Sequence, residues 1–188
     1  MADLRRLNIV DESGKIISED TRENIHNKGL LHREIHVWFY TPRDEIIFQH
    51  RAKDKDTYPD LLDATVGGHV EIGSDYEESA LKEMEEETGI KADRNDLHFI
   101  ETVRNKAYDP VTNKTNNVIR AIYAYLYDGR TEDLKVEQGK AIGFEAWPLR
   151  EIFNIPEDER KRFVPIILEE NHLELFRKIQ RLLGKESL

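Results

Sequence analysis

The chain has 188 residues, which is enough for one well-buried domain. Its formal net charge of −10 argues against a general nucleic-acid binder, because basic surfaces are what hold phosphate backbones. It contains no cysteine, so disulfides, thiolate metal ligands and thiol nucleophiles are excluded. No apolar run approaches the roughly 20 residues of a membrane helix, and the N-terminus lacks a signal-peptide apolar segment. We therefore expect a cytoplasmic protein that does not bind a membrane or a nucleic-acid polymer.

The first third of the chain is predicted to be mainly β-structure. The expected elements are two strands within 7–18, a helical turn near 23–26 ending at Gly29, a hairpin over 33–51 and a short buried strand over 61–66. Within the hairpin, apolar residues alternate with His, Trp and Tyr, and Thr41 to Asp44 supply the turn. The last strand leads into a glycine loop at Gly67 and Gly68.

A helix is predicted over 75–88. Ser74 followed three residues later by Glu77 has the pattern of a capping box, which places the start of the helix. Gly89 has the position of a C-terminal stop. The stretch is therefore expected to form a glycine loop, a capped helix and a second loop.

The rest of the chain is predicted to contain strands followed by helices. The expected elements are strands over 97–105 and 117–129 with a polar loop over 106–116, a strand over 139–149, and helices over 157–170 and 171–184. The last helix carries an apolar stripe that we interpret as core packing, with dimerisation through this stripe as the alternative. We find no repeat and no flexible linker.

These elements predict one α/β (α+β) domain over 1–188. We divide it into N-terminal strands and a helical turn (1–30), a core (31–155) and C-terminal helices (156–188).

The helix over 75–88 carries the strongest chemical signal. At 100° per residue, Glu83, Glu86 and Glu87 fall on one arc of about 100° beside an apolar face. Like charges at i,i+3 and i,i+4 destabilise a helix by a few tenths of a kcal/mol per pair. A cation between the carboxylates offsets this repulsion, and oxygen ligands suit Mg²⁺ or Mn²⁺. A solvated acidic helix is the alternative interpretation.

The stretch "GGHVEIGSDYEESALKEMEEETGI" resembles the Nudix box, G-x5-E-x7-R-E-U-x-E-E-x-G-U with U a bulky aliphatic residue. Gly68 matches the first glycine, and the second half is matched by Glu83, Met84, Glu86, Glu87, Gly89 and Ile90. Two positions depart from the motif. Its first Glu is Ser74 here, and its Arg is Lys82, which keeps the positive charge.

The resemblance implies a Nudix fold, a mixed β-sheet between helices, with additional C-terminal helices. It also implies hydrolysis of a nucleoside diphosphate derivative or a related small diphosphate, with Mg²⁺ (or Mn²⁺) held by Glu83, Glu86, Glu87 and the Gly68 carbonyl. Glu83 or Glu86 is our candidate for the base, and Glu137 and Glu145 are candidates outside the box. A non-catalytic Nudix-fold module that binds a nucleotide or a regulatory partner is the alternative function.

Residues expected to contact the substrate phosphates lie in or near the glycine loop. They are Arg51, Gly67, Gly68, His69 and Lys82. Residues that would contact a base or sugar are not evident, although Tyr58 and Tyr108 are candidates for stacking on a ring.

The segments 28–40 and 65–73 also resemble isopentenyl-diphosphate isomerase, an enzyme of the same fold. Its catalytic cysteine is matched by Gly67, and its two later glutamates are matched approximately by Thr115 and Asn117. Without these groups an alkene cannot be protonated and deprotonated, so we exclude isomerase activity. His32 and His69, with His26 as the candidate third, match metal-binding histidines of that enzyme. They either form a remnant metal site or serve as a strand residue and a phosphate-loop residue.

Overall fold

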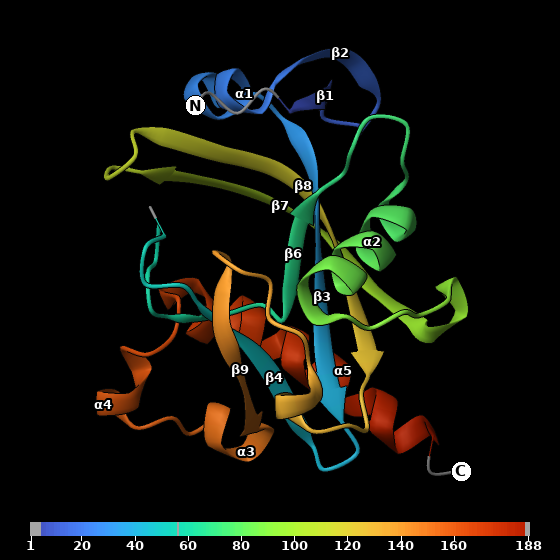
Figure 1. The fold of residues 1–188 in the computed structure, drawn as a ribbon, viewed down its shortest axis with the longest axis vertical. Coiled ribbons are helices and arrows are strands. Elements are labelled where there is room, and N and C mark those ends of the chain that lie inside the picture. Colours follow the sequence, from blue (N-terminus) through green and yellow to red (C-terminus); the bar gives the residue numbers. More distant parts are fainter. Residues whose placement is uncertain (1–4, 56, 187–188) are drawn as a thin grey trace.

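The computed structural model describes residues 5–55 and 57–186. It contains one mixed sheet, with α2 (Tyr76–Thr88) on one face and α5 (Glu170–Glu186) on the other (Figure 1). The central strand β3 (His32–Thr41) pairs along its length with several neighbours, and only its pairing with β8 (Lys114–Leu126) is parallel. The predicted sheet between helices is confirmed.

The N-terminal elements agree with the prediction. Strands β1 (Arg6–Val10) and β2 (Ile16–Thr21) form an antiparallel pair, and helix α1 (Arg22–Lys28) follows at once. Thr21 accepts a hydrogen bond from the backbone of Asn24 at the start of this helix. Gly29 ends the helix with a φ of 62°, in the left-handed region that glycine tolerates best.

The hairpin of β3 and β4 (Glu45–Arg51) opens beyond its first three residue pairs. Strand β6 (Val66–His69) then takes over as the partner of β3. Thr65 lies at this fork, where its hydroxyl accepts from the backbone N–H of Phe39 and donates to the carbonyl of Ile47. A single buried side chain thus satisfies the backbone groups left where the two strands separate.

Two predictions about the glycine stretch were wrong in detail. The expected strand over 61–66 is divided into β5 (Leu62–Asp63) and β6, with β5 pairing to β4. Gly67 and Gly68 belong to β6 instead of a loop, and they pair with His36 and Ile35. Glycine is intrinsically weak in a strand, so the pairing with β3 and the close approach of α2 override its local preference.

The start of α2 lies one residue later than the predicted capping box implies. Asp75 is the N-cap, and its carboxylate accepts from the backbone of Glu78 at 2.8 Å, while Glu78 accepts from the backbone of Asp75 at 3.1 Å. The prediction of Ser74 and Glu77 as the box was therefore wrong. Asp is as good an N-cap as Ser, so the two registers could not be separated by residue type.

Strands β7 (Leu97–Asp109) and β8 form a long hairpin that extends beyond the body of the sheet (Figure 1). The predicted polar loop over 106–116 is mostly strand, because pairing continues to Asp109 and Lys114. Backbone pairing does not need apolar side chains, so a polar sequence hid these strand ends. The last strand, β9 (Ala141–Pro148), pairs antiparallel with β4 from Glu45 to Arg51.

The predicted helix over 157–170 was wrong. It is replaced by the short α4 (Glu157–Arg160) and a 3₁₀ turn over Pro165–Leu168. Pro165 lacks the N–H that a continuing helix would need, and the residue before it is driven out of the helical region. The remaining short elements are α3 (Leu149–Ile152) and 3₁₀ turns over Arg94–Asp96 and Thr131–Asp133.

The core lies on both faces of the sheet. On one face Trp38, Tyr40 and Phe48 pack against α5, and on the other face Val37 and Phe39 belong to the cluster that includes residues of α2. The apolar stripe of α5 is buried at Leu175, Phe176 and Ile179, which have exposed fractions of 2%, 0% and 0%. The interpretation of this stripe as core packing is confirmed.

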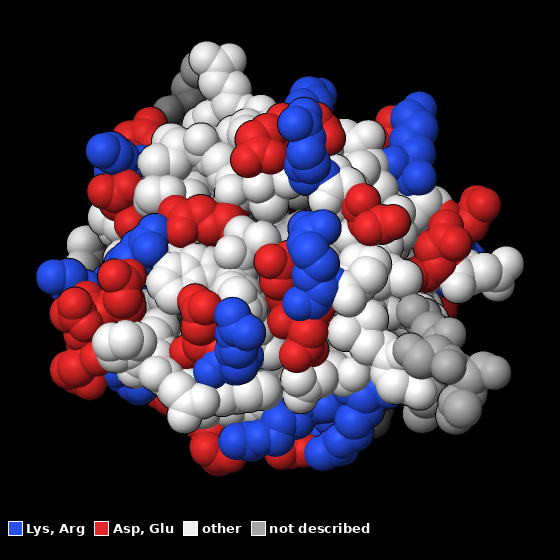
Figure 2. Space-filling view, turned by 90° about the horizontal axis from the view of Figure 1, so that it is seen from below, with Lys and Arg blue, Asp and Glu red and all other residues white. Residues whose placement is uncertain are grey.

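Acidic and basic side chains are interleaved on the face of the molecule shown in Figure 2. Arg94, for example, pairs with Asp75, Glu77 and Glu78 at the start of α2. Among the described residues, no helix is both long enough and apolar enough to cross a membrane.

Candidate active site

The site is built where β6 passes beneath α2. A Cβ on Gly68 would stand 2.2 Å from Cδ of Glu83, a separation that real Cβ atoms do not show. Any side chain at position 68 would therefore displace the Glu83 carboxylate. The buried Ala80 and Met84 hold this helix against the sheet and direct Glu83 and Glu87 toward the strand.

Glu87 is the most enclosed carboxylate of the site, with an exposed fraction of 0%. Gln49 of β4 donates to its Oε2 at 2.6 Å and also to the carbonyl of Thr65 at 3.3 Å. The backbone N–H of Gly67 lies 3.4 Å from its other oxygen. Glu87 is thus held from the sheet side by two donors.

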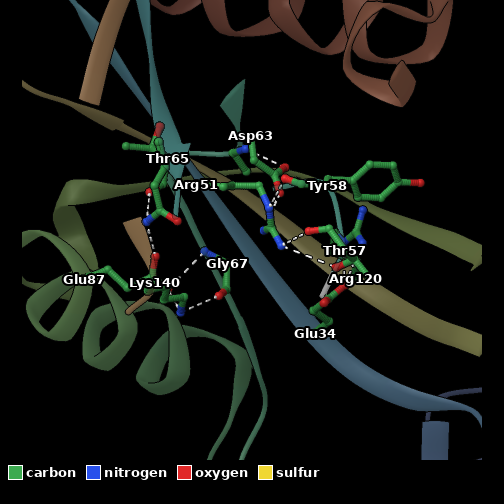
Figure 3. A network of polar contacts seen from close by, with 12 residues as sticks. Glu34, Arg51, Thr57, Tyr58, Asp63, Thr65, Gly67, Glu87, Arg120 and Lys140 are labelled. Atoms are coloured by element: carbon green, nitrogen blue, oxygen red, sulfur yellow. Dashed lines mark hydrogen bonds and ion pairs between the residues drawn. The ribbon is translucent and has the colours of Figure 1, made fainter. Parts of the chain in front are cut away.

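The cation of the site is supplied by Lys140, which directly precedes β9. Its Nζ donates to Glu87 and to the carbonyl of Gly67, the latter at 3.2 Å (Figure 3). It also lies 3.5 Å from Glu83. Glu137 is 3.9 Å away. Oxygens from α2, from β6 and from the segment before β9 therefore converge on one positive group.

Burial governs the protonation of this cluster. It raises the pKa of Glu87 to about 7, although Lys140 opposes the shift, and it also raises the pKa of Glu83. Burial alone would lower the pKa of Lys140, but the carboxylates of Glu87 and Glu83 outweigh it and raise that pKa. Lys140 is thus held as an ammonium ion that stabilises two crowded carboxylates.

The residues present fit a divalent metal ion. The donors of Glu83, Glu87 and Gly67 are all oxygen atoms, the ligand type that Mg²⁺ and Mn²⁺ prefer. They already surround a positive charge, because the Lys140 ammonium stands among them. The carbonyl that reaches this point is that of Gly67, one residue before the Gly68 carbonyl that we expected as a ligand.

Glu86, the third predicted ligand, is placed differently. Its side chain is 53% exposed and lies 3.9 Å from Lys82. Lys82, which we expected at the substrate, instead pairs with Glu71 at 2.7 Å. The partner of Lys82 is thus Glu71, three residues before Ser74, which stands at the position of the motif's first Glu.

Arg51 is engaged within the protein. Its guanidinium donates to Asp63 at 3.0 Å and to the carbonyls of Thr57 and Tyr58 at 2.8 and 3.0 Å (Figure 3). These bonds hold the segment that follows β4. The structure therefore places Arg51 as a support of this loop, while a role toward substrate phosphate stays a prediction.

Three histidines are brought together beside the site. The ligating nitrogens of His26, His32 and His69 lie within 4.8 Å of one another. Nδ1 of His26 and Nδ1 of His32 each face a backbone carbonyl, at 2.8 and 3.0 Å. This leaves the lone pair on Nε2 of both rings, and the buried Nε2 atoms of His32 and His69 have no hydrogen-bond partner.

Burial lowers the pKa of each ring in this histidine cluster, so all three are neutral near pH 7. Neutral imidazoles suit a borderline ion such as Zn²⁺ better than Mg²⁺. The structure thus brings together the three histidines of the metal interpretation, which itself stays a prediction. Asn117, the approximate match for one isomerase glutamate, instead donates to the Gly29 carbonyl at 2.8 Å.

The two base candidates outside the box differ in placement. Glu137 lies beside Lys140, at the edge of the acidic cluster. Glu145 is bound by Arg162 at 2.6 Å and lies 3.5 Å from His50. Glu137 is therefore the better placed of the two.

A pocket of about 290 Å³ opens beside Glu83. Its lining joins Glu83 and His69 to three arginines, Arg5, Arg6 and Arg22. A larger hollow of about 630 Å³ is lined by Trp147, Arg150 and other residues near α3 and α4, and it includes no residue of the acidic cluster. The smaller pocket thus adjoins Glu83 and is lined by three arginines, of which Arg6 is paired with Glu19 at 2.9 Å, while Glu71 also belongs to the lining.

Sequence reasoning missed Gln49 and Lys140. Each lies far along the chain from Glu87, by 38 and 53 residues. Lys140 reaches the site because β9 pairs with β4, with Ala141 opposite Arg51. No local signal marks such a residue, although an acidic cluster in the interior does call for a nearby cation.

The fold defines the class of protein. The crystal structure of DR0079 from Deinococcus radiodurans superposes with a TM-score of 0.68 and 18% identity, covering 93% of this chain and 98% of that one. The NUDIX domain of Shewanella oneidensis NrtR, complexed with ADP ribose, superposes with a TM-score of 0.54 and 16% identity, covering 81% and 87%. At these identities the similarity shows a shared NUDIX fold.

Residues 30–166 match the NUDIX domain family, and the chain belongs to it. An uncharacterized Nudix hydrolase from Yersinia pestis is 39% identical over 84 residues, which are 45% of this chain and 46% of that protein. Another from Clostridium acetobutylicum is 27% identical over 161 residues, covering 84% and 73%. The matched segment thus spans about half of the first relative, and the predicted family is confirmed.

Proposed function

We propose that the protein is a divalent-metal-dependent hydrolase of a diphosphate linkage. The substrate is a nucleoside diphosphate derivative or a related small diphosphate, and the ion is Mg²⁺, with Mn²⁺ as a substitute. The observation that carries this proposal is the convergence of Glu83, Glu87 and the Gly67 carbonyl on one cation position. A solvated acidic helix would not bury Glu87 completely.

In this proposal Glu83 and Glu87 of α2 would hold the ion, and Glu86 of the same helix would be the third carboxylate ligand. When bound, Mg²⁺ neutralises diphosphate charge and lowers the pKa of the attacking water. Glu83, Glu86 or Glu137 takes the proton as the water oxygen bonds to phosphorus. The bridging P–O bond then breaks, and the second phosphate leaves with its electron pair.

The arginines of the 290 Å³ pocket support an anionic substrate. They face the same space as Glu83, so a phosphate there would lie between positive side chains and the metal ligand. Arginine binds phosphate with paired donors in a fixed geometry.

The proposal is tested by replacing Glu86 and Glu87 with Gln and measuring Mg²⁺-dependent product release from a panel of diphosphates. We expect a loss of about 100-fold or more, because the amide removes the charge that holds the ion. Glu85→Gln is the matched control, since Glu85 is an exposed glutamate of the same helix that pairs with Lys91. Unchanged turnover in the double variant would contradict the proposal.

A non-catalytic nucleotide-binding module is the second candidate. It is favoured by Ser74 and Lys82 at two motif positions, and by the NrtR domain, a relative in fold that was crystallised with ADP ribose. Calorimetry with Mg²⁺ and ADP-ribose separates the two. Heat of binding without product over several hours supports the module, and appearance of product supports the hydrolase.

A further inference from the structure

Lys140 occupies the point at which the ligands of the proposed metal ion meet. Its Nζ contacts Glu87, the Gly67 carbonyl at 3.2 Å and Glu83 at 3.5 Å. A divalent ion held by these same oxygens would stand in nearly the same space. The ammonium group and the ion would also repel each other at such short range. The two cations therefore cannot be bound together in this arrangement.

The backbone of Lys140 is fixed by hydrogen bonds, whereas its side chain can move toward solvent. Its N–H donates to the Glu137 carbonyl at 3.1 Å, and its own carbonyl accepts from Ala52 at 3.0 Å. Its side chain is 27% exposed, compared with 0% for Glu87. Four flexible side-chain bonds thus allow the ammonium to leave the cluster without any movement of the strand.

We propose that Lys140 is a built-in competitor for the metal ion. In the metal-free protein its ammonium neutralises Glu83 and Glu87, and a divalent ion binds only by displacing it toward solvent. The displaced ammonium then lies at the edge of the site, where the phosphate groups of the substrate provide a new partner. This inference rests on the proposed function, because it takes the carboxylates to be metal ligands.

The protein itself provides another cation of the same segment for comparison. Lys135 is exposed, its N–H donates to the Thr88 carbonyl at 2.9 Å, and its side chain lies beside Gly89 at the end of α2. Lys135→Met therefore removes the same charge and side chain as Lys140→Met without altering the acidic cluster. Differences between the two variants report the position of Lys140 and not the net charge.

The first test measures binding of Mn²⁺ alone by calorimetry in wild type, Lys140→Met and Lys135→Met. We expect Lys140→Met to bind Mn²⁺ roughly tenfold more tightly than wild type, because a competing cation has left the site. Lys135→Met should bind like wild type. Equal or weaker binding by Lys140→Met, with binding retained in wild type, would overturn the inference.

Thermal unfolding provides a readout that a purely structural lysine would not give. Lys140→Met should unfold at a lower temperature than wild type in EDTA, because Glu83 and Glu87 then repel each other uncompensated. Mn²⁺ should raise its unfolding temperature by more than it raises that of wild type. A loss of stability that Mn²⁺ does not restore would instead indicate a structural bridge and overturn the inference.

A measurement on the wild-type chain tests the inference even if Lys140→Met does not fold. An amine-reactive acetylating reagent should modify Lys140 several-fold faster with saturating Mg²⁺ than with EDTA, as read by peptide mass spectrometry, while Lys135 serves as the internal control. An unchanged rate at Lys140, with Mg²⁺ binding shown by calorimetry, would overturn the inference. Absence of any ion binding in both wild type and Lys140→Met would refute the proposed function itself.

Discussion

At the scale of single residues, Gly68 and Glu83 depend on each other. The absent side chain of Gly68 is what leaves room for the Glu83 carboxylate, since a Cβ there would stand within 2.3 Å of its Oε1. Glu87 also depends on a partner, Gln49, whose amide donates a hydrogen bond to one oxygen of this fully buried carboxylate. The chemistry of the acidic helix is therefore set by partners on the sheet.

We expect Gly68→Ala to reduce Mn²⁺ affinity and metal-dependent turnover by roughly tenfold or more, because the new methyl group displaces Glu83 from the ion. Gly143→Ala is the matched control, as no atom beyond its two chain neighbours lies within 4 Å of the Cβ that it would add. Titration calorimetry with Mn²⁺ measures the first effect and a turnover assay the second. If both alanine variants behave alike, the proximity of Gly68 to Glu83 has no functional consequence.

At the scale of elements, α2 is positioned by its cap as well as by its apolar face. Asp75 accepts from the Glu78 backbone and is also bound by Arg94, which joins the helix start to the segment before β7. Glu71 and Lys82 form a second tie between the loop and the helix. The helix can therefore tolerate three nearby glutamates, because other contacts fix its position.

We expect Asp75→Ala to lower the free energy of unfolding by about 1 kcal/mol, the usual cost of losing an N-cap. Ser74→Ala should change it by less than about 0.5 kcal/mol, because the structure assigns no cap to Ser74. Urea denaturation of both variants gives these values. A larger loss in Ser74→Ala than in Asp75→Ala would show that the helix begins one residue earlier.

At the scale of the whole molecule, several histidines are enclosed between the sheet and the elements around it. Burial lowers the pKa of His172 from its ordinary value of 6.5 to about 4. Burial also lowers the pKa of His36 well below its ordinary value. His172 lies on α5 with its ring against Trp38 of the central strand, at 6.3 Å between centroids. These rings are neutral in the folded protein. As the pH falls, they are therefore protonated at a higher pH in the unfolded chain than in the folded protein.

The sign of the resulting pH dependence follows directly. A folded pKa below the unfolded one contributes stability that is complete above pH 6.5 and is lost as the pH falls toward 4. Between pH 6.5 and pH 4, the free energy of unfolding of His172→Gln should fall by less than that of wild type, by a difference of up to about 3 kcal/mol. Urea unfolding at a series of pH values measures it. Parallel curves for wild type and His172→Gln would contradict the assignment.

Local patterns in the sequence predicted much of the secondary structure. Alternating apolar residues predicted the hairpin of β3 and β4, and the spacing of Glu83 and Glu87 predicted that their carboxylates lie on one side of α2, whereas Glu86 lies on its exposed side. These predictions succeed because a strand repeats every two residues and a helix every 3.6, so neighbours in sequence determine which face is buried. The predicted helix over 157–170 failed where Pro165 interrupts it.

Long-range pairing was beyond the reach of the linear pattern. Gly67 lies in a strand because β3 separates from β4 and leaves its edge open, and Lys140 reaches Glu87 because β9 pairs with β4. The residue types along the chain thus specify the acidic helix and its glycine partner. Which cation faces them, which carboxylate is buried and which histidines meet all depend on strand register, since contacts between distant segments exist only once the sheet has assembled.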